Sequence, residues 1–262
     1  MTLGQNPTPV VLTDLDGTLL EPDGQILPEV LDFLLTLKEA GVTVCPVTSK
    51  TPAELAYLLD RWGLAFPAGF ENGAGVRLAN GQLELQPKAV PVTRLEEILT
   101  LLREKTGLFV RSVSDLEDHE LAAITGLPAE QIPATRKRLA SLPLVVEPRW
   151  DVLLQAALPQ DPPVRLLRGN RFLHLQGPHG KAEVVPQLLK LMGHPCGPVV
   201  ACGDSPNDEE LLAAATVQVI VPGSQGPHPG LCQRFPSALI PSEPHGRGWV
   251  EALKRVFSEL LP

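Results

Sequence analysis

The stretch VVLTDLDGTLL, residues 10–20, decides the fold that this sequence of 262 residues predicts. It begins with a short apolar run that ends in a turn signal, a pattern typical of a buried strand. Asp14 and Asp16 then lie at the C-terminal end of the strand, which in an open parallel sheet faces the ligand crevice. Carboxylates so close repel each other unless a cation or a shared proton lies between them. Unless Asp-Gly marks only an ordinary turn, the stretch predicts a metal site, acid/base chemistry or both.

Elements on both sides of the middle of the chain alternate between helix and strand. After the opening strand, apolar periodicity predicts a helix at 28–41, a strand at 42–47, a helix at 52–62, a weak strand at 64–68 and a hairpin at 75–85. Near the end of the chain it predicts a helix at 180–192, strands at 198–202 and 217–221, and a helix at 249–260. This alternation predicts an α/β protein with a Rossmann-like parallel sheet as its core.

The pattern changes between residues 87 and 176. This segment predicts helices at 94–104, 118–124 and 128–139, strands at 108–113 and 144–146, and a strand pair at 164–167 and 172–175 around the turn Arg168-Gly169-Asn170. We therefore expect two domains. Residues 1–86 and 177–262 form the core, and residues 87–176 form an inserted α+β domain.

The composition excludes several kinds of partner. A formal net charge of −8 makes nucleic acid or an anionic membrane surface a poor main partner. No apolar run approaches the ~18 residues that cross a bilayer, and residues 1–9 have neither the basic start nor the apolar core of a signal peptide. The four cysteines form no C-x-x-C pair, and the chain has neither a G-x-S-x-G elbow nor a Walker loop. We expect a soluble cytoplasmic protein that acts on a small molecule.

A second strand end carries two hydroxyls and a lysine. Thr48, Ser49 and Lys50 follow the strand at 42–47, and a helix begins directly after Thr51. Hydroxyl and ammonium groups beside a helix N-terminus form an anion site. Helix capping explains Thr51 but not the other three residues. We therefore favour phosphate binding at this strand end.

A third strand end adds further carboxylates. Asp204 and Asp208 belong to the sequence GDSPND after the strand at 198–202, and Lys181 opens the preceding helix. Taken alone, the two aspartates could cap a helix and the lysine could be solvated. Together with Asp14 and Asp16, however, they make a set of four aspartates that suits an oxygen-only Mg²⁺ site beside a phosphate.

These motifs resemble the four motifs of the haloacid dehalogenase superfamily, in the same order and on the same elements. The motif residues are DLDGT at 14–18, Thr48, Lys181 and GDSPND at 203–208. The inserted domain resembles the cap of the type IIB subgroup, and within it the chain is similar to the mannosyl-3-phosphoglycerate phosphatase family. The stretches that carry this similarity are VTSKT at 47–51, ENGA at 71–74, SDL at 114–116, ITGL at 124–127, RFLH at 171–174 and residues 246–249. The chain departs from the family at Val146, which replaces a hydroxyl residue, and at Leu173, which replaces an aromatic.

The resemblance implies a phosphatase that converts 2-O-mannosyl-3-phosphoglycerate to mannosylglycerate and phosphate through an aspartyl-phosphate. It implies that Asp14 is the nucleophile and Asp16 the general acid and base, and that Thr48 and Lys181 hold the phosphoryl oxygens. The implied Mg²⁺ site comprises Asp14, Asp16 through its backbone carbonyl, Asp204 and Asp208, with Asp208 and Asn207 orienting the metal shell. The implied substrate contacts are Ser49, Lys50, Glu71, Asn72, Arg171, His174 and Asn207.

Three alternatives stay open from the sequence. The substrate could be another sugar phosphate, such as glucosyl-3-phosphoglycerate or a hexose phosphate. The aspartyl-phosphate could instead pass its phosphoryl group to a sugar hydroxyl, which would make the protein a phosphomutase. The scaffold could also serve as a non-catalytic binding module, although all four motif positions keep usable residues.

Overall fold

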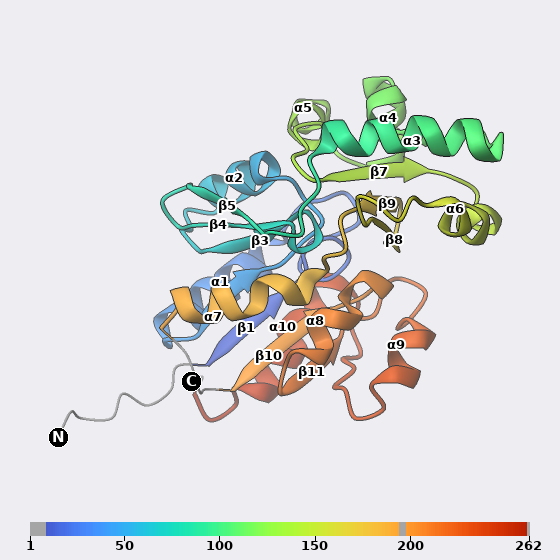
Figure 1. Cartoon of the computed structure of the whole chain (residues 1–262). Helices are drawn as coiled ribbons and strands as arrows, with labels where there is room; N and C mark the ends of the chain where they lie inside the picture. Colours follow the sequence, from blue (N-terminus) through green and yellow to red (C-terminus); the bar gives the residue numbers. More distant parts are fainter. Residues whose placement is uncertain (1–8, 194–197, 261–262) are drawn as a thin grey trace.

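The structure, a computed structural model, describes residues 9–193 and 198–260 (Figure 1). Its core contains a four-stranded parallel sheet with the order β11–β10–β1–β2. The strands are β1 (Val10–Thr13), β2 (Thr43–Pro46), β10 (Val199–Gly203) and β11 (Val217–Ile220). The opening strand thus lies inside the sheet, and the expected α/β fold with a parallel core is confirmed.

Helices cover both faces of this sheet. Val11 packs with α1, α2 and α10, whereas Val10 and Leu12 pack with α7, α8 and α9. These helices are α1 (Pro28–Glu39), α2 (Pro52–Arg61), α7 (Val185–Leu191), α8 (Glu209–Ala213), α9 (Pro229–Arg234) and α10 (His245–Val256). Because successive strand residues point to opposite faces, a strand buried on both sides consists of consecutive apolar residues.

A small antiparallel sheet extends the core beyond β2. It contains β3 (Ala68–Phe70), β4 (Gly75–Arg77) and β5 (Leu83–Leu85), and a parallel bridge joins Val47 to Gly69. The hairpin is confirmed. The strand expected at 64–68 is wrong, because Gly63 adopts a φ of 66° and the Leu64 N–H bonds back to Leu59 at the end of α2. The chain becomes extended only when it reaches Ala68.

The segment between β5 and the end of β9 forms a second unit, called the cap below. Its antiparallel sheet has the order β6–β7–β9–β8. The strands are β6 (Arg111–Ser112), β7 (Ser141–Val145), β8 (Arg165–Arg168) and β9 (Leu173–Gln176), and the helices are α3 (Val92–Thr106), α4 (Asp118–Thr125), α5 (Ile132–Thr135) and α6 (Asp151–Ala157). Figure 1 shows α3 lying along the side of the cap that faces away from the core. The inserted α+β unit is therefore present.

Two parts of the cap differ from expectation. The helix expected at 128–139 is wrong beyond α5, because the N–H groups of Leu139 and Ala140 donate to the Glu71 carboxylate and not to helical carbonyls. Helix α6 was not predicted. It has only seven residues and exposes Val152 and Leu153, so its apolar pattern does not mark a single buried face.

Residues 1–8, which belong to the N-terminal segment considered above, lie outside the described residues. Cys196, one of the four cysteines, lies outside them as well. Within the described part, the three other cysteines are free. None of the helices there has the length and apolar character that crossing a membrane requires.

Candidate active site

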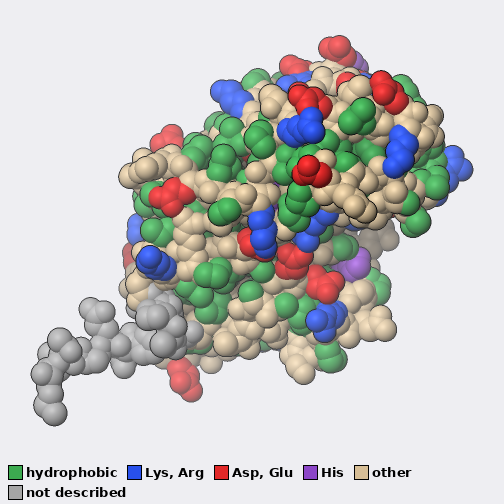
Figure 2. Space-filling view, viewed as in Figure 1, with side chains coloured by type: hydrophobic (Ala, Val, Ile, Leu, Met, Phe, Trp, Pro, Cys, Tyr) green, Lys and Arg blue, Asp and Glu red, His purple; other side chains and the backbone are tan. Residues whose placement is uncertain are grey.

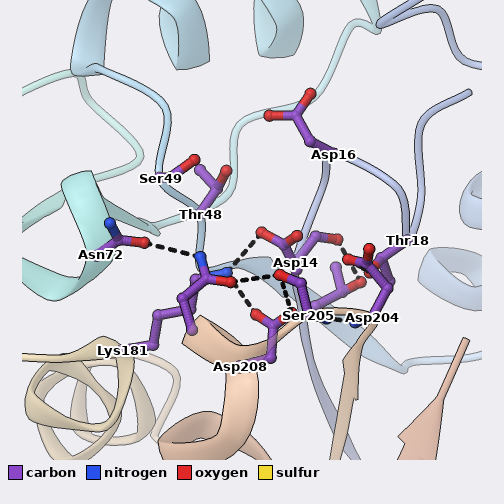
Figure 3. A network of polar contacts seen from close by, with 12 residues as sticks. Asp14, Asp16, Thr18, Thr48, Ser49, Asn72, Lys181, Asp204, Ser205 and Asp208 are labelled. Carbon is purple, nitrogen blue, oxygen red and sulfur yellow. Dashed lines mark hydrogen bonds and ion pairs between the residues drawn. The ribbon is translucent and has the colours of Figure 1, made fainter. Parts of the chain in front are cut away.

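Three adjacent strand ends bring the predicted motif residues together. Asp14 follows β1, Thr48 follows β2 and Asp204 follows β10. Since β1 pairs in parallel with both β2 and β10, these ends lie at one edge of the sheet. Figure 3 shows the three residues there, with Lys181 and Asp208 beside them. The structure thus places the four motifs around one point.

Lys181 is the centre of this cluster. It lies in a short 3₁₀ turn, and its side chain is completely buried. Its Nζ lies 2.6 Å from Asp14 Oδ1 and 2.5 Å from Asp208 Oδ1 (Figure 3). Burial alone would lower the pKa of Lys181, but the two carboxylates raise it above its ordinary value. The lysine therefore stays charged, with one of its three N–H donors left for a further oxygen.

The carboxylates of Asp14, Asp204 and Asp208 carry more negative charge than Lys181 can balance. One oxygen of each lies within 4.8 Å of the others. Burial, with the charges of Asp208 and Asp16, raises the pKa of Asp14 to about 7 despite the opposing lysine. Burial also raises the pKa of Asp204 well above its ordinary value, and Asp208 and Asp14 raise it further. Such an unbalanced, oxygen-only set fits a hard divalent cation such as Mg²⁺.

Asp208 holds the loop after β10 in place. Its Oδ2 accepts hydrogen bonds from the N–H groups of Asp204 and Ser205, both at 3.0 Å, while its Oδ1 binds Lys181. A Cβ at Gly203 would lie 2.5 Å from the Cβ of Asp208, so only glycine allows this close approach. Asp208 is therefore positioned to orient Asp204 and Lys181.

The glycine and threonine of the opening stretch shape the surroundings of Asp204. The Thr18 hydroxyl donates to Asp204 Oδ1 at 3.0 Å, and the Asn170 amide of the cap donates to Oδ2 at 2.6 Å. A Cβ at Gly17, whose φ is 84°, would lie 2.5 Å from the same Oδ2. The DLDGT sequence thus provides both the space for Asp204 and one of its hydrogen-bond donors.

The carboxylate of Asp16 lies apart from the buried cluster (Figure 3). It forms an ion pair with Lys50, whose Nζ is 2.8 Å away. Burial would raise the pKa of Asp16, but Lys50 and its hydrogen bond lower the pKa below the ordinary value. Lys50 also lies 3.9 Å from Glu54. The two aspartates of the opening stretch therefore occupy different electrostatic environments.

A cavity of about 270 Å³ lies between the strand ends of the core and the cap. The predicted residues that line it are Asp14, Asp16, Ser49, Lys50, Arg171, His174, Asp204 and Asn207. Others were not predicted as site residues, among them Gly17, Glu54, Thr135, Arg138, Asn170 and His245. On the face shown in Figure 2, charged side chains of both signs gather where the cap meets the core. The cavity therefore draws on both units.

Two cap residues that were expected to contact substrate have different characters. Arg171 is exposed, and its guanidinium donates to the Pro22 carbonyl of the core at 2.6 Å. His174 is buried against Phe172, and burial lowers the pKa of His174 to about 3. It is therefore neutral at pH 7 and can offer a hydrogen bond but no positive charge.

Five of the predicted site residues do not line the cavity, namely Thr48, Glu71, Asn72, Lys181 and Asp208. Thr48 is buried, and its hydroxyl accepts the N–H of Lys50 at 3.3 Å. Asn72 donates to Gln176 and accepts from Asn207, both at 3.1 Å. Glu71 is fully buried beside it in a backbone turn of positive φ. The polar side-chain atoms of Glu71 and Asn72 thus have protein partners, and contact of these residues with substrate stays a prediction.

The Glu71 carboxylate joins the core to the cap through hydrogen bonds. Its carboxylate accepts hydrogen bonds from Leu139 N at 2.8 Å, Ala140 N at 2.9 Å and Ser141 Oγ at 2.8 Å. We expect Glu71→Gln to lower the free energy of unfolding by about 2 to 3 kcal/mol, because an amide group would face these donors. Urea unfolding measures the change, with Glu39→Gln at an exposed site on α1 as the control. Equal stability of the two variants would contradict this role.

The acidic cluster predicts that Mg²⁺ stabilises the fold. A cation present at 100 times its dissociation constant should raise the free energy of unfolding by about 2.7 kcal/mol. We expect Asp204→Asn to remove most of this gain, since the variant loses a carboxylate ligand. Thermal unfolding with and without Mg²⁺ measures it, and Asp60→Asn, exposed on α2, serves as the control. A full Mg²⁺ response in Asp204→Asn would exclude this residue as a ligand.

Comparisons with known proteins agree with this geometry. The sequence pattern of haloacid dehalogenase-like hydrolases matches residues 11–118, which include Asp14 and Thr48. The chain is 24% identical over 265 residues to a glucosyl-3-phosphoglycerate/mannosyl-3-phosphoglycerate phosphatase of Persephonella marina, covering 96% of this chain and 98% of the relative.

Two solved structures share the fold. A protein of Thermoplasma acidophilum superimposes with a TM-score of 0.73 at 16% identity, covering 98% of this chain and 100% of that one. A sugar phosphatase of HAD subclass IIB superimposes with a TM-score of 0.71 at 16% identity, covering 96% and 99%. Residues 11–118 are thus similar to haloacid dehalogenase-like hydrolases, and the whole chain is similar in sequence to the phosphatase of Persephonella marina.

Proposed function

We propose that the chain is a magnesium-dependent phosphatase of glycosyl-3-phosphoglycerates and that its preferred substrate is 2-O-mannosyl-3-phosphoglycerate. Its broader class, a phosphoric monoester hydrolase, follows from the family and from the phosphatase that it resembles over nearly its whole length. One observation carries the proposal. Asp14, which lines the cavity, is paired with the buried Lys181, and further cations line the same cavity. Asp14 and Lys181 suit a phosphoryl group, and the further cations suit a substrate with a second negative charge.

Asp14 is the nucleophile in this mechanism. Lys181 holds its Oδ1, so Oδ2 is the atom that attacks phosphorus. The bond from phosphorus to the glycerate oxygen breaks as the aspartyl-phosphate forms, which divides a difficult displacement into two easier ones. The remaining N–H of Lys181 and the hydroxyl of Thr48 hold phosphoryl oxygens where transition-state charge builds up.

Asp16 moves the proton in both half-reactions. The negative charge of the bound ester raises the pKa of Asp16, which opposes the effect of Lys50 and lets the carboxyl group carry a proton. It gives this proton to the leaving oxygen and then takes one from the water that cleaves the aspartyl-phosphate. General acid/base assistance of this kind contributes about 10²- to 10⁴-fold to the rate.

Mg²⁺ would be held by Asp14, the backbone carbonyl of Asp16 and Asp204, and it supplies charge that offsets the repulsion between nucleophile and phosphate. The cap residues then exclude bulk water from the floor. Asn170 and Arg171 already bridge from the cap to Asp204 and Pro22. Cap closure therefore completes the site around a bound substrate.

Phosphate release from a substrate panel with Mg²⁺ tests the proposal. The panel contains 2-O-mannosyl-3-phosphoglycerate, its glucosyl counterpart, 3-phosphoglycerate and hexose phosphates. We expect the highest kcat/KM for the mannosyl ester, followed by the glucosyl ester. A higher value for a hexose phosphate would overturn the substrate assignment. An isomeric sugar phosphate, detected by ³¹P NMR in place of free phosphate, would show a phosphomutase.

A further inference from the structure

Arg138 is a buried cation of the cap that points into the cavity. It follows α5, its side chain is 7% exposed, and it lines the space above Lys50 and Asp16. Its Nε donates to the Thr135 carbonyl at 3.1 Å, and its Nη1 donates to the Ser49 carbonyl at 2.7 Å. The guanidinium is therefore held in one position across the boundary between cap and core.

Arg138 forms an ion pair with Glu54 but no hydrogen bond to it. The nearest carboxylate oxygen, on Glu54, lies 3.8 Å from Nη2, beyond hydrogen-bond distance. Glu54 also accepts hydrogen bonds from the Thr51 N–H at 2.9 Å and the Thr135 hydroxyl at 3.1 Å. Among the described residues, Nη2 of Arg138 donates no hydrogen bond to a protein acceptor. A buried guanidinium with a free N–H edge suits a carboxylate ligand.

The other cations near the cavity are already engaged. Lys181 binds two carboxylates at the floor, and Lys50 is paired with Asp16. Arg171 is exposed and donates to the Pro22 carbonyl. His174 is neutral at pH 7, because burial and then the charge of Arg138 lower its pKa to about 3. Among the described residues, Arg138 is thus a buried cation in the cavity wall that forms no hydrogen bond with a carboxylate.

We propose that Arg138 binds the carboxylate of the glycerate moiety and so selects glycosyl-phosphoglycerates over sugar phosphates that lack a carboxylate. This inference rests on the proposed function. It assigns to the cap a role that differs from phosphate binding, because Asp14 and Asp204 line the cavity from the strand ends of the core, whereas Arg138 lines it from the cap. A substrate held at both ends places its ester bond between them, which is the positioning that catalysis requires.

The test compares two esters that differ only at the carboxylate. One is 2-O-mannosyl-3-phosphoglycerate, and the other is 2-O-mannosylglycerol 3-phosphate, in which a hydroxymethyl group replaces the carboxylate. We expect Arg138→Met to lower kcat/KM about 100-fold on the ester with the carboxylate, mainly through KM, and less than about 3-fold on the ester without it. Arg138→Lys should retain part of the preference, because it keeps the charge but loses the planar donor edge.

Two controls separate recognition from folding. Arg149→Met removes an exposed cap arginine and should leave both values unchanged. Thermal unfolding shows whether each Arg138 variant keeps its structure. An equal loss on both esters would overturn the inference and show that Arg138 only ties the cap to Ser49. If the wild-type protein releases phosphate from neither ester, the proposed function fails and this assignment fails with it.

Discussion

Asp14→Asn should abolish phosphate release, with a loss in kcat of about 10⁴-fold or more, as for removal of other covalent nucleophiles. The amide has nearly the shape of the carboxylate, so the hydrogen bond from Lys181 can remain. It cannot, however, form the bond to phosphorus that starts the reaction. Removing a carboxylate from the acidic cluster also lowers the repulsion that raises the pKa of Asp204. The variant should therefore fold at least as well as the wild-type protein.

Three measurements examine the Asp14→Asn prediction. Phosphate release gives the loss of turnover, and thermal unfolding confirms that the variant is folded. Rapid quenching of the wild-type reaction should show phosphate bound covalently to the protein, and the variant should show none. Asp32→Asn makes the same chemical change at an exposed position on α1 and should keep full activity. Turnover above about 1% of wild type in Asp14→Asn would mean that another group attacks phosphorus.

The core sheet and the cluster of polar residues at its strand ends could be predicted because local sequence determines both. Residues 10–12 are consecutive and apolar, and the structure buries each of them completely. Asp14 and Asp204 come directly after such strands, and Thr48 comes two residues after the end of β2. Parallel pairing then brings them together without any contact that depends on a distant loop. For these residues, the position in the sequence determines the position in the site.

The cap contacts could not be predicted in the same way. Glu71 meets Ala140 across 69 residues, and Arg138 meets Ser49 across 89. No spacing in the sequence marks these pairs. The sequence ENGA at 71–74 predicts a site at Glu71, but only the structure shows that its carboxylate binds the cap at Leu139, Ala140 and Ser141. The turn at Asn170 was expected, whereas its contact with Asp204 depends on how the two units are packed.

Lys181→Met should cost both stability and activity. The side chain is completely buried between Asp14 and Asp208, so its removal leaves two buried carboxylates without their cation. Breaking a buried ion pair in this way lowers the free energy of unfolding by about 3 to 5 kcal/mol. Activity should fall at least about 10³-fold, because the phosphoryl oxygens lose their fixed donor. Lys190→Met, exposed on α7, should change neither property.

The cost of Lys181→Met should depend on pH. Without the lysine, which lowers the pKa of Asp14 from a value already raised by burial, the pKa rises further above that of the unfolded chain. When the pKa of a carboxyl group is higher in the native protein than in the unfolded chain, the free energy of unfolding falls as the pH rises from the unfolded pKa to the native pKa. The variant should therefore be least stable relative to wild type above pH 7, and the difference should shrink as the pH falls towards 5. Urea unfolding across this range, without divalent cations, measures the effect. A difference independent of pH would show that Lys181 stabilises the fold by packing and not by its charge.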